Sequence, residues 1–128
     1  MKICKNYING EWVESVSGKT APTYNPANGE ILAEVVQSGL EAIQAKYPTV
    51  IEEVRGVGMM MAVEFFSDEY GYEFSKEMYN QHVIISGTLN NSKSIRFEPP
   101  VSLTPEEIAK ILDASDKAAA KVKKVFGL

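Results

Sequence analysis

The residues best suited to chemistry lie in one polar stretch, from residue 87 to residue 100. Its sequence, GTLNNSKSIRFEPP, places amides, hydroxyls and one arginine next to apolar segments. Loops of this kind hold polar groups over a rigid scaffold. Arg96 precedes two prolines on a predicted strand, where its planar guanidinium can bind the carboxylate of a ligand. A salt bridge to Glu98, Glu64 or another acid is the structural alternative, because such arginine pairs are common.

Other combinations that could support chemistry are weaker. His82 is the only histidine and Cys4 the only cysteine, whereas a zinc or redox-metal site needs several such ligands. A nucleophilic triad would need a serine and a carboxylate brought to the same histidine, and no spacing supports it. The Gly-Val-Gly at 56–58 lacks the third glycine and the following helix of a dinucleotide-binding loop. We therefore expect no metal, triad or nucleotide site.

Composition and charge limit the class of protein. The chain has 128 residues, 45% of them apolar and 23% charged, which suits one compact globular domain. A formal net charge of −4 argues against nucleic acid as a partner, because phosphates require a basic face. No apolar run approaches the roughly 18 residues of a membrane span, so we expect no membrane insertion. The lone thiol fits a reducing compartment, and we expect a cytoplasmic protein.

The first 37 residues are rich in turn signals. Asn9-Gly10 lies between strand-forming residues, and it favours a tight hairpin because both residues tolerate positive φ. Residues 25–29 predict a second turn. Ile31 to Val36 predict a third strand from their largely apolar character. We therefore expect a β-hairpin and one further strand in this segment.

Residues 38–128 alternate between helix and strand patterns. Leu40, Ile43 and Tyr47 share one face of a predicted short helix that ends at Pro48. Further strands are predicted at residues 50–55, 59–66, 83–86 and 94–98, and helices at residues 68–81 and after residue 104. Thr104 can cap the last helix. The order α-β-β-α-β-β-α predicts an α+β fold, an antiparallel sheet covered by helices, with the N-terminal β-hairpin segment added.

Residues 39–128 resemble the C-terminal small domain of class III pyridoxal-phosphate aminotransferases. The resemblance is carried by EVRGVGM at 53–59, MAVEF at 61–65, GY at 71–72, GTLNN at 87–91 and IRFEPP at 95–100. Within that family, the putrescine aminotransferases are the most similar. The resemblance implies the small-domain fold of these enzymes and pyridoxal phosphate as the cofactor of the whole enzyme.

The resemblance also implies roles for individual residues. In that family the arginine at the position of Arg96 holds the α-carboxylate of an amino or keto acid such as 2-oxoglutarate. Arg96 is therefore the residue that the resemblance assigns to substrate. The loop at 87–91 lies near the active site in such enzymes, which makes Thr88, Asn90 and Asn91 weaker candidates. No catalytic, cofactor-binding or metal-binding residue is expected in this chain alone.

Residues 1–37 are similar to the beginning of aldehyde dehydrogenases. The similarity is carried by YINGEWV at 7–13, SGK at 17–19 and YNPANGEILAEV at 24–35. In that family this segment carries no catalytic residue. We therefore divide the chain into an aldehyde dehydrogenase-like β segment, residues 1–37, and an aminotransferase-like domain, residues 38–128.

Neither resemblance brings a catalytic centre with it. The lysine that forms the Schiff base and the acid that pairs with the pyridine nitrogen would belong to the aminotransferase large domain. A dehydrogenase would need its nucleophilic cysteine and a nicotinamide-binding fold. We therefore expect a chimeric fragment without catalysis of its own. Two alternatives stay open: an interaction module that forms homo-oligomers or binds full-length aminotransferase subunits, and a weak binding domain for 2-oxo acid carboxylates.

Overall fold

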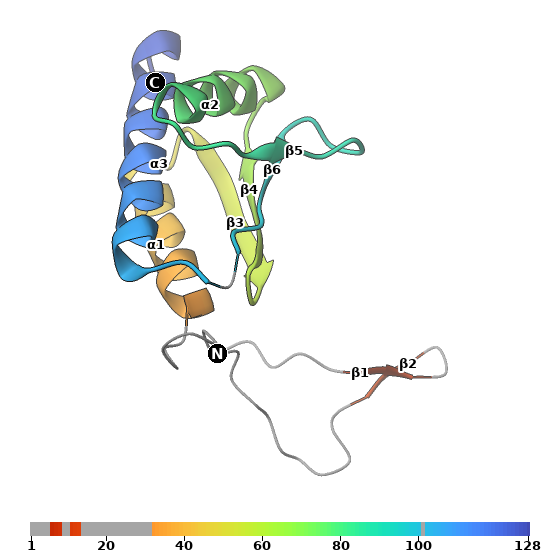
Figure 1. The fold of residues 1–128 in the computed structure, drawn as a ribbon. Helices are drawn as coiled ribbons and strands as arrows, with labels where there is room; N and C mark the ends of the chain where they lie inside the picture. Colours follow the sequence, from red (N-terminus) through yellow and green to blue (C-terminus); the bar gives the residue numbers. More distant parts are fainter. Residues whose placement is uncertain (1–5, 9–10, 14–31, 101) are drawn as a thin grey trace.

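A computed structural model of the chain describes residues 6–8, 11–13, 32–100 and 102–128 (Figure 1). Its elements are, in chain order, β1 (Asn6–Ile8), β2 (Glu11–Val13), α1 (Leu32–Lys46), β3 (Ile51–Val57), β4 (Met60–Phe65), α2 (Asp68–Asn80), β5 (Ser86–Gly87), β6 (Ser94–Phe97) and α3 (Pro105–Phe126). None of the described helices is both long and apolar enough to cross a membrane.

Four strands form one sheet in the order β3-β4-β6-β5. Each strand is antiparallel to its neighbours. The helices α1, α2 and α3 lie on the same side of this sheet (Figure 1). The arrangement confirms the predicted fold class, an α+β fold in which helices cover an antiparallel sheet. Within the described residues, the covered face is the one that forms the core.

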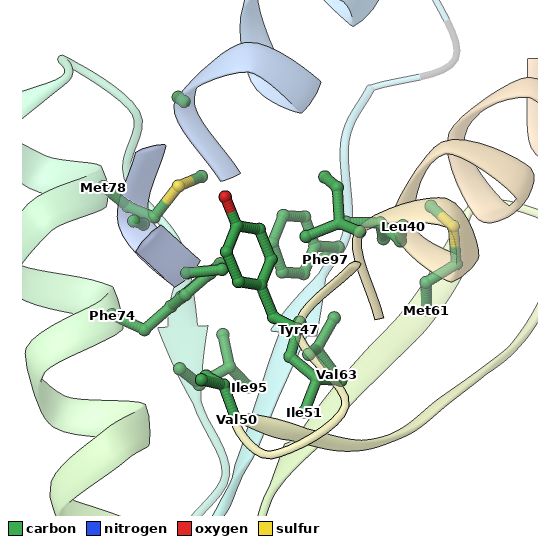
Figure 2. Close-up of a cluster of buried hydrophobic side chains, with 14 of the residues drawn as sticks. Leu40, Tyr47, Val50, Ile51, Met61, Val63, Phe74, Met78, Ile95 and Phe97 are labelled. Atoms are coloured by element: carbon green, nitrogen blue, oxygen red, sulfur yellow. The ribbon is translucent and has the colours of Figure 1, made fainter. Parts of the chain in front are cut away.

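The core lies between the sheet and the helices (Figure 2). Phe65 of β4 and Phe97 of β6 are at most 3% exposed, and Phe74 of α2 is 1% exposed. The ring centroid of Phe74 lies 4.9 Å from that of Phe65 and 6.5 Å from that of Phe97. Aromatic pairs at such separations contribute about 0.5–1.5 kcal/mol beyond the burial itself. These contacts fix α2 over the two central strands.

Helix α1 begins at Leu32, so the strand predicted at residues 31–36 is wrong over the described residues. The buried residues of α1 and of the turn after it follow the spacing of one helix face: Val36, Leu40, Ile43 and Tyr47. A short apolar run is compatible with either a strand or a helix. Here the packing of one buried face against the core selects the helix. The helix also runs through the predicted junction at residues 37–39 without a break.

The predicted N-terminal hairpin is present as β1 paired with β2 in antiparallel register. Its Asn9-Gly10 turn lies outside the described residues, as does the turn predicted at residues 25–29. The strand predicted at residues 83–86 is wrong in extent, because β5 begins only at Ser86. Residues 83–85 are used instead to lead the chain out of the end of α2.

Helix α2 ends in a Schellman motif that has a histidine at its left-handed position. The backbone N–H of Val83 donates to the carbonyl of Met78 at 2.9 Å, and that of His82 donates to the carbonyl of Tyr79 at 3.0 Å. His82 has a φ of 62°, in the region where glycine is usual at this position. The chain's one histidine therefore acts as a helix cap, and it is exposed.

Helix α3 has the start that the sequence predicts. The N–H of Thr104 donates to Glu107 Oε2 at 2.7 Å, and the N–H of Glu107 donates to Thr104 Oγ1 at 3.3 Å, which completes a capping box. The helix packs beside α1, where Lys46 Nζ lies 2.7 Å from Asp116 Oδ1. Helices α1 and α3 therefore lie side by side in the helical layer that covers the sheet.

Candidate functional site

The candidate site lies on the face of the sheet opposite the helices. Side chains of a strand alternate between the two faces, and the register places two rows of residues across this open face. The first row holds four residues from the four strands: Arg55, Ala62, Arg96 and Ser86. The second row holds three: Glu53, Glu64 and Ser94. The two arginines of the chain therefore share one row, separated by one strand.

Arg96 is only loosely held in this row. Its neighbours Ile95 and Phe97 point into the core, and the Arg96 side chain is 47% exposed on the open face. Its Nη1 lies 3.5 Å from Glu98 Oε1, and its Nη2 lies 3.5 Å from Ser86 Oγ. Both distances exceed those of strong charge-assisted hydrogen bonds. The guanidinium therefore keeps donor capacity for a ligand.

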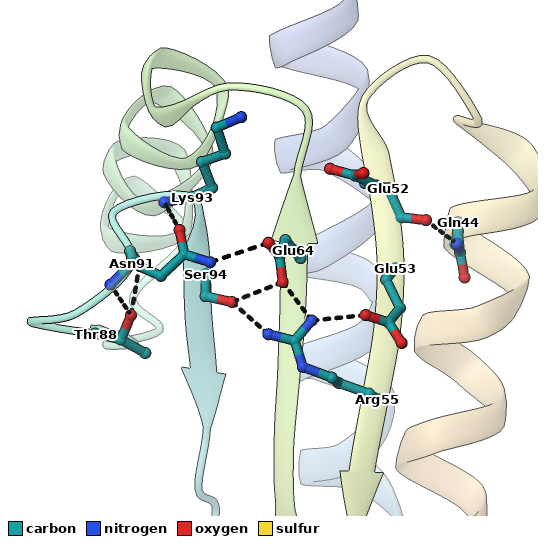
Figure 3. A network of polar contacts seen from close by, with 9 residues as sticks. All are labelled: Gln44, Glu52, Glu53, Arg55, Glu64, Thr88, Asn91, Lys93 and Ser94. Atoms are coloured by element: carbon teal, nitrogen blue, oxygen red, sulfur yellow. Dashed lines mark hydrogen bonds and ion pairs between the residues drawn. The ribbon is translucent and has the colours of Figure 1, made fainter.

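Arg55 is bound much more tightly (Figure 3). Its Nη1 forms an ion pair with Glu64 Oε2 and lies 2.9 Å from Glu53 Oε2, while its Nη2 donates to Ser94 Oγ at 2.9 Å. The hydrogen bond with Glu64 is the main cause that raises the pKa of Arg55 above its ordinary value. Two carboxylates thus neutralise this arginine.

Glu64 connects the two central strands with the loop after β5 (Figure 3). Its Oε1 accepts a hydrogen bond from Asn91 Nδ2 at 2.9 Å, and its Oε2 accepts one from Ser94 Oγ at 3.3 Å in addition to the pair with Arg55. The amide of Asn91, followed by the guanidinium of Arg55, holds the pKa of Glu64 below its ordinary value. The Glu64 side chain is 21% exposed, and the donors Asn91, Arg55 and Ser94 outweigh the effect of burial, so its lowered pKa keeps this acid ionised.

The loop residues predicted as weaker candidates have different surroundings. The Thr88 hydroxyl donates to the carbonyl of Asn91 and accepts from its N–H at 3.2 Å. Asn91 Oδ1 also accepts from the backbone N–H of Lys93 at 3.1 Å. Thr88 and Asn91 therefore shape the loop from within, whereas Asn90 is exposed.

Sequence reasoning did not single out Arg55 or Ser94 for this face, and it named Glu64 only as a possible partner of Arg96. The alternating pattern of the strands could have placed all three on polar faces. The pairing between strands that are far apart in sequence could not be read in the same way, because it depends on register. The structure pairs Arg96 with Glu98 and gives Glu64 to Arg55 instead.

Two further expectations concern metal ligands and the Gly-Val-Gly segment. Among the described residues, no group of three or more His, Cys, Asp or Glu side chains could hold a metal ion. In the Gly-Val-Gly segment, residues 56 and 57 belong to β3 and the turn is formed by Gly58 and Met59, so the strand β4 follows this segment. The segment thus lies in a hairpin, with its turn displaced toward residue 59.

Comparisons with known proteins decide the family. The family model for class-III aminotransferases matches residues 27–119, which is more than half of the chain. The chain belongs to the class III aminotransferase family. The matched range begins before the predicted junction at residues 37–39.

Solved aminotransferases share the fold of this class III chain. A lysine aminotransferase from M. tuberculosis matches with a TM-score of 0.66 at 23% identity, over 70% of this chain and 20% of that one. An ornithine aminotransferase from Plasmodium yoelii matches with a TM-score of 0.62 at 19% identity, over 71% and 24%. A transaminase from directed evolution by ancestral reconstruction matches with 0.64 at 26%, over 73% and 22%. The chain thus spans between a fifth and a quarter of the length of these proteins.

Class III aminotransferases use pyridoxal phosphate, which needs an enclosed lysine for its Schiff base. All lysines in the described ranges are exposed: Lys46, Lys76, Lys93, Lys110, Lys117, Lys121, Lys123 and Lys124. The described residues therefore do not form a site that fits this cofactor. What they offer is a cation for a carboxylate, Arg96, on a face where the other arginine, Arg55, is already paired with two acids.

Proposed function

We propose that this chain provides the carboxylate-binding part of a class III aminotransferase, and that alone it binds 2-oxo acids weakly through Arg96. The observation that carries the proposal is the contrast between two arginines of one row. Arg55 is paired with two carboxylates, whereas the Arg96 side chain is 47% exposed and its guanidinium lies 3.5 Å from Glu98 Oε1 and from Ser86 Oγ. A guanidinium in that state can receive a carboxylate through two parallel N–H donors.

The amine substrate of the whole enzyme and the source of its Schiff-base chemistry can be proposed as well. The stretches GTLNN and IRFEPP favour a putrescine-type enzyme. Such an enzyme transfers an amino group from the amine to a 2-oxo acid such as 2-oxoglutarate. Schiff-base chemistry would come from a second, cofactor-binding domain, because the described lysines are all exposed. This chain alone would then not catalyse transamination.

We also propose that residues 1–37 derive from an aldehyde dehydrogenase, joined to the aminotransferase domain near residues 37–39. The sequence resemblance supports this origin, and the hairpin of β1 and β2 is compatible with it. An aldehyde dehydrogenase would oxidise the aldehyde that amine transfer produces, so the two parent activities are chemically consecutive.

A cytoplasmic location without nucleic acid or membrane partners fits the lone cysteine and the acidic charge.

The test is an amide NMR titration of the labelled chain with 2-oxoglutarate, followed by putrescine and pyridoxal phosphate. We expect local shifts around Arg96 and Ser86, saturating only at high ligand concentration. Arg96→Ala should abolish them. Lys124→Ala removes the same charge from an exposed position on α3 and should leave them unchanged. Shifts that persist in Arg96→Ala would refute the role of Arg96, and transamination by the purified chain would refute the lack of catalysis.

A second candidate, an interaction module, is favoured by exposed apolar side chains. Tyr72 and Tyr79 of α2 are 73% and 70% exposed, and Ile84 is 85% exposed. The three side chains line one shallow apolar groove. Exposed apolar patches of this kind often mark contacts with another protein, here a second copy or a full-length aminotransferase subunit. Light scattering should show oligomers of this chain, and Ile84→Glu should dissociate them. If the chain is a monomer and its addition does not change the activity of a full-length aminotransferase, this function is excluded.

A further inference from the structure

Glu64 and Arg96 are diagonal neighbours on the open face. Arg96 of β6 pairs with Ala62 of β4, and Glu64 follows Ala62 by two positions, opposite Ser94. Diagonal neighbours of adjacent antiparallel strands are about 7–8 Å apart, within reach of long side chains. A glutamate and an arginine in this relation are able to form an ion pair. In this chain they do not, because the Glu64 carboxylate is bound elsewhere.

The carboxylate of Glu64 is held by side chains from three other segments: β3, β6 and the loop before β6. Arg55 lies on β3, whereas Arg96 lies on β6, and β4 runs between them. Oε2 of Glu64 is shared by Arg55 and Ser94, and Oε1 is held by Asn91 (Figure 3). Each oxygen thus has a donor that does not belong to Arg96.

Arg55 provides the only charge among these donors. Without it, Glu64 would be an ionised carboxylate with 79% of its side chain covered, given its 21% exposure, and with only neutral hydrogen-bond partners. A covered charge without a counter-ion is strongly disfavoured. Strands β3 to β6 contain no lysine, so Arg96 is the other cation on this face.

We propose that Arg55 is a positioning residue that keeps Arg96 available by sequestering Glu64. The proposal rests on the proposed function of Arg96 as a carboxylate-binding residue. Arg55 itself does not touch the ligand. It binds the one acid that register places within reach of Arg96 from the neighbouring strand, and a ligand carboxylate then meets no internal competitor on that strand.

Three variants test this role by 2-oxoglutarate titration followed by NMR. Arg55→Gln should weaken binding about two- to fivefold, the effect expected of one competing exposed ion pair. Arg55→Gln combined with Glu64→Gln should restore the wild-type affinity. The control double variant, Arg55→Gln with Glu53→Gln, has the same net charge as the double variant that carries Glu64→Gln. It leaves Glu64 in place, so it should bind as weakly as Arg55→Gln alone.

A measurement without ligand separates this inference from the proposed function. Exchange of the Arg96 side-chain N–H protons should slow in Arg55→Gln and return to the wild-type rate when Glu64→Gln is added. If wild-type chain binds no 2-oxoglutarate but this pattern is seen, the proposed function fails and the sequestration of Glu64 stands. If exchange is unchanged in Arg55→Gln, or if both double variants restore binding equally, the sequestration is refuted.

Arg55→Lys keeps the experiment decisive if Arg55→Gln does not fold. Lysine retains the charge but not the planar fork that reaches Glu64, Glu53 and Ser94 together. We expect a smaller loss of affinity than for Arg55→Gln and the same selective restoration by Glu64→Gln. Restoration by Glu53→Gln to the same extent would contradict the inference.

Discussion

Asn91 Nδ2 donates a hydrogen bond to Glu64 Oε1 at 2.9 Å and so joins the loop after β5 to the central strand β4. The two residues are 27 positions apart in the sequence. The same asparagine is hydrogen-bonded within the loop through Thr88 and Lys93. The Asn91 side chain therefore anchors the loop that borders the open face to the sheet, in addition to the backbone hydrogen bond that Phe65 N–H donates to the carbonyl of Lys93.

Asn91→Ala should release this loop while the sheet stays folded. We expect faster hydrogen–deuterium exchange for the amides of residues 88–93 and a loss of about 1 kcal/mol in the free energy of unfolding. The loss stays moderate because Glu64 keeps its pair with Arg55. Asn90→Ala, at the exposed neighbouring position, is the control and should change neither quantity. Equal exchange in both variants would contradict the anchoring role.

Acid should destabilise the fold partly through Glu64. Asn91 and Arg55 lower the pKa of Glu64 in the folded chain. A carboxyl with a lowered native pKa stabilises the fold above its unfolded pKa, about 4.3 for glutamate, and this contribution is lost as pH falls through the native value. Urea unfolding should therefore give a flatter decline below about pH 4.3 in Glu64→Gln than in the wild type. Glu52→Gln, at an exposed acid, should leave the decline unchanged; parallel curves for wild type and Glu64→Gln would exclude the effect.

His82→Gly should stabilise the chain. The left-handed backbone of His82, with φ of 62°, costs a side-chain-bearing residue about 1 kcal/mol, and glycine does not carry this cost. We expect the melting temperature to rise by a few degrees. His82→Ala retains a Cβ in the same backbone region and should give no increase. A similar increase in both variants would mean that the imidazole, and not the backbone, is unfavourable.

Gly56→Ala should destabilise the β3–β4 hairpin. A Cβ at residue 56 would lie 2.7 Å from the backbone oxygen of Met60 and 2.9 Å from the Cα of Met61. These are backbone atoms of the paired strand, so the strands themselves would have to move. We expect a loss of about 2 kcal/mol or more in chemical unfolding. Gly87→Ala is the matched control in β5, where a Cβ meets nothing within 4 Å, and a comparable loss there would contradict this explanation.

Glu98→Gln should strengthen carboxylate binding by Arg96. Glu98 is the acid paired with Arg96, at 3.5 Å, and both side chains are almost half exposed. A pair of this kind contributes little, so we expect about a twofold gain in 2-oxoglutarate affinity in the NMR titration. Glu106→Gln removes an exposed acid at the start of α3 and serves as the charge control. An unchanged affinity in Glu98→Gln would show that Glu98 does not compete for the guanidinium.

Local patterns were sufficient for much of the fold. The start of α3 could be predicted because Thr104, Pro105 and Glu107 act within one helical turn. Residues 31–36 could not be assigned in the same way, because an apolar run fits either a strand or a helix. Packing of Val36 in the same buried face as Leu40 and Ile43 decides for helix. The deciding contacts are between elements, and no local pattern contains them.

The sequence by itself determined the α+β order of elements and the capping of α3, and it led to the prediction that Arg96 is the residue suited to a carboxylate. These features depend on residue type and on spacing within one element. Only the tertiary structure decided which acid each arginine meets. Register places Glu64 between Arg55 and Ser94, and it leaves Arg96 with Glu98 at a longer distance. Strand pairing joins residues far apart in the chain, and a shift by one residue would send every one of these side chains to the other face.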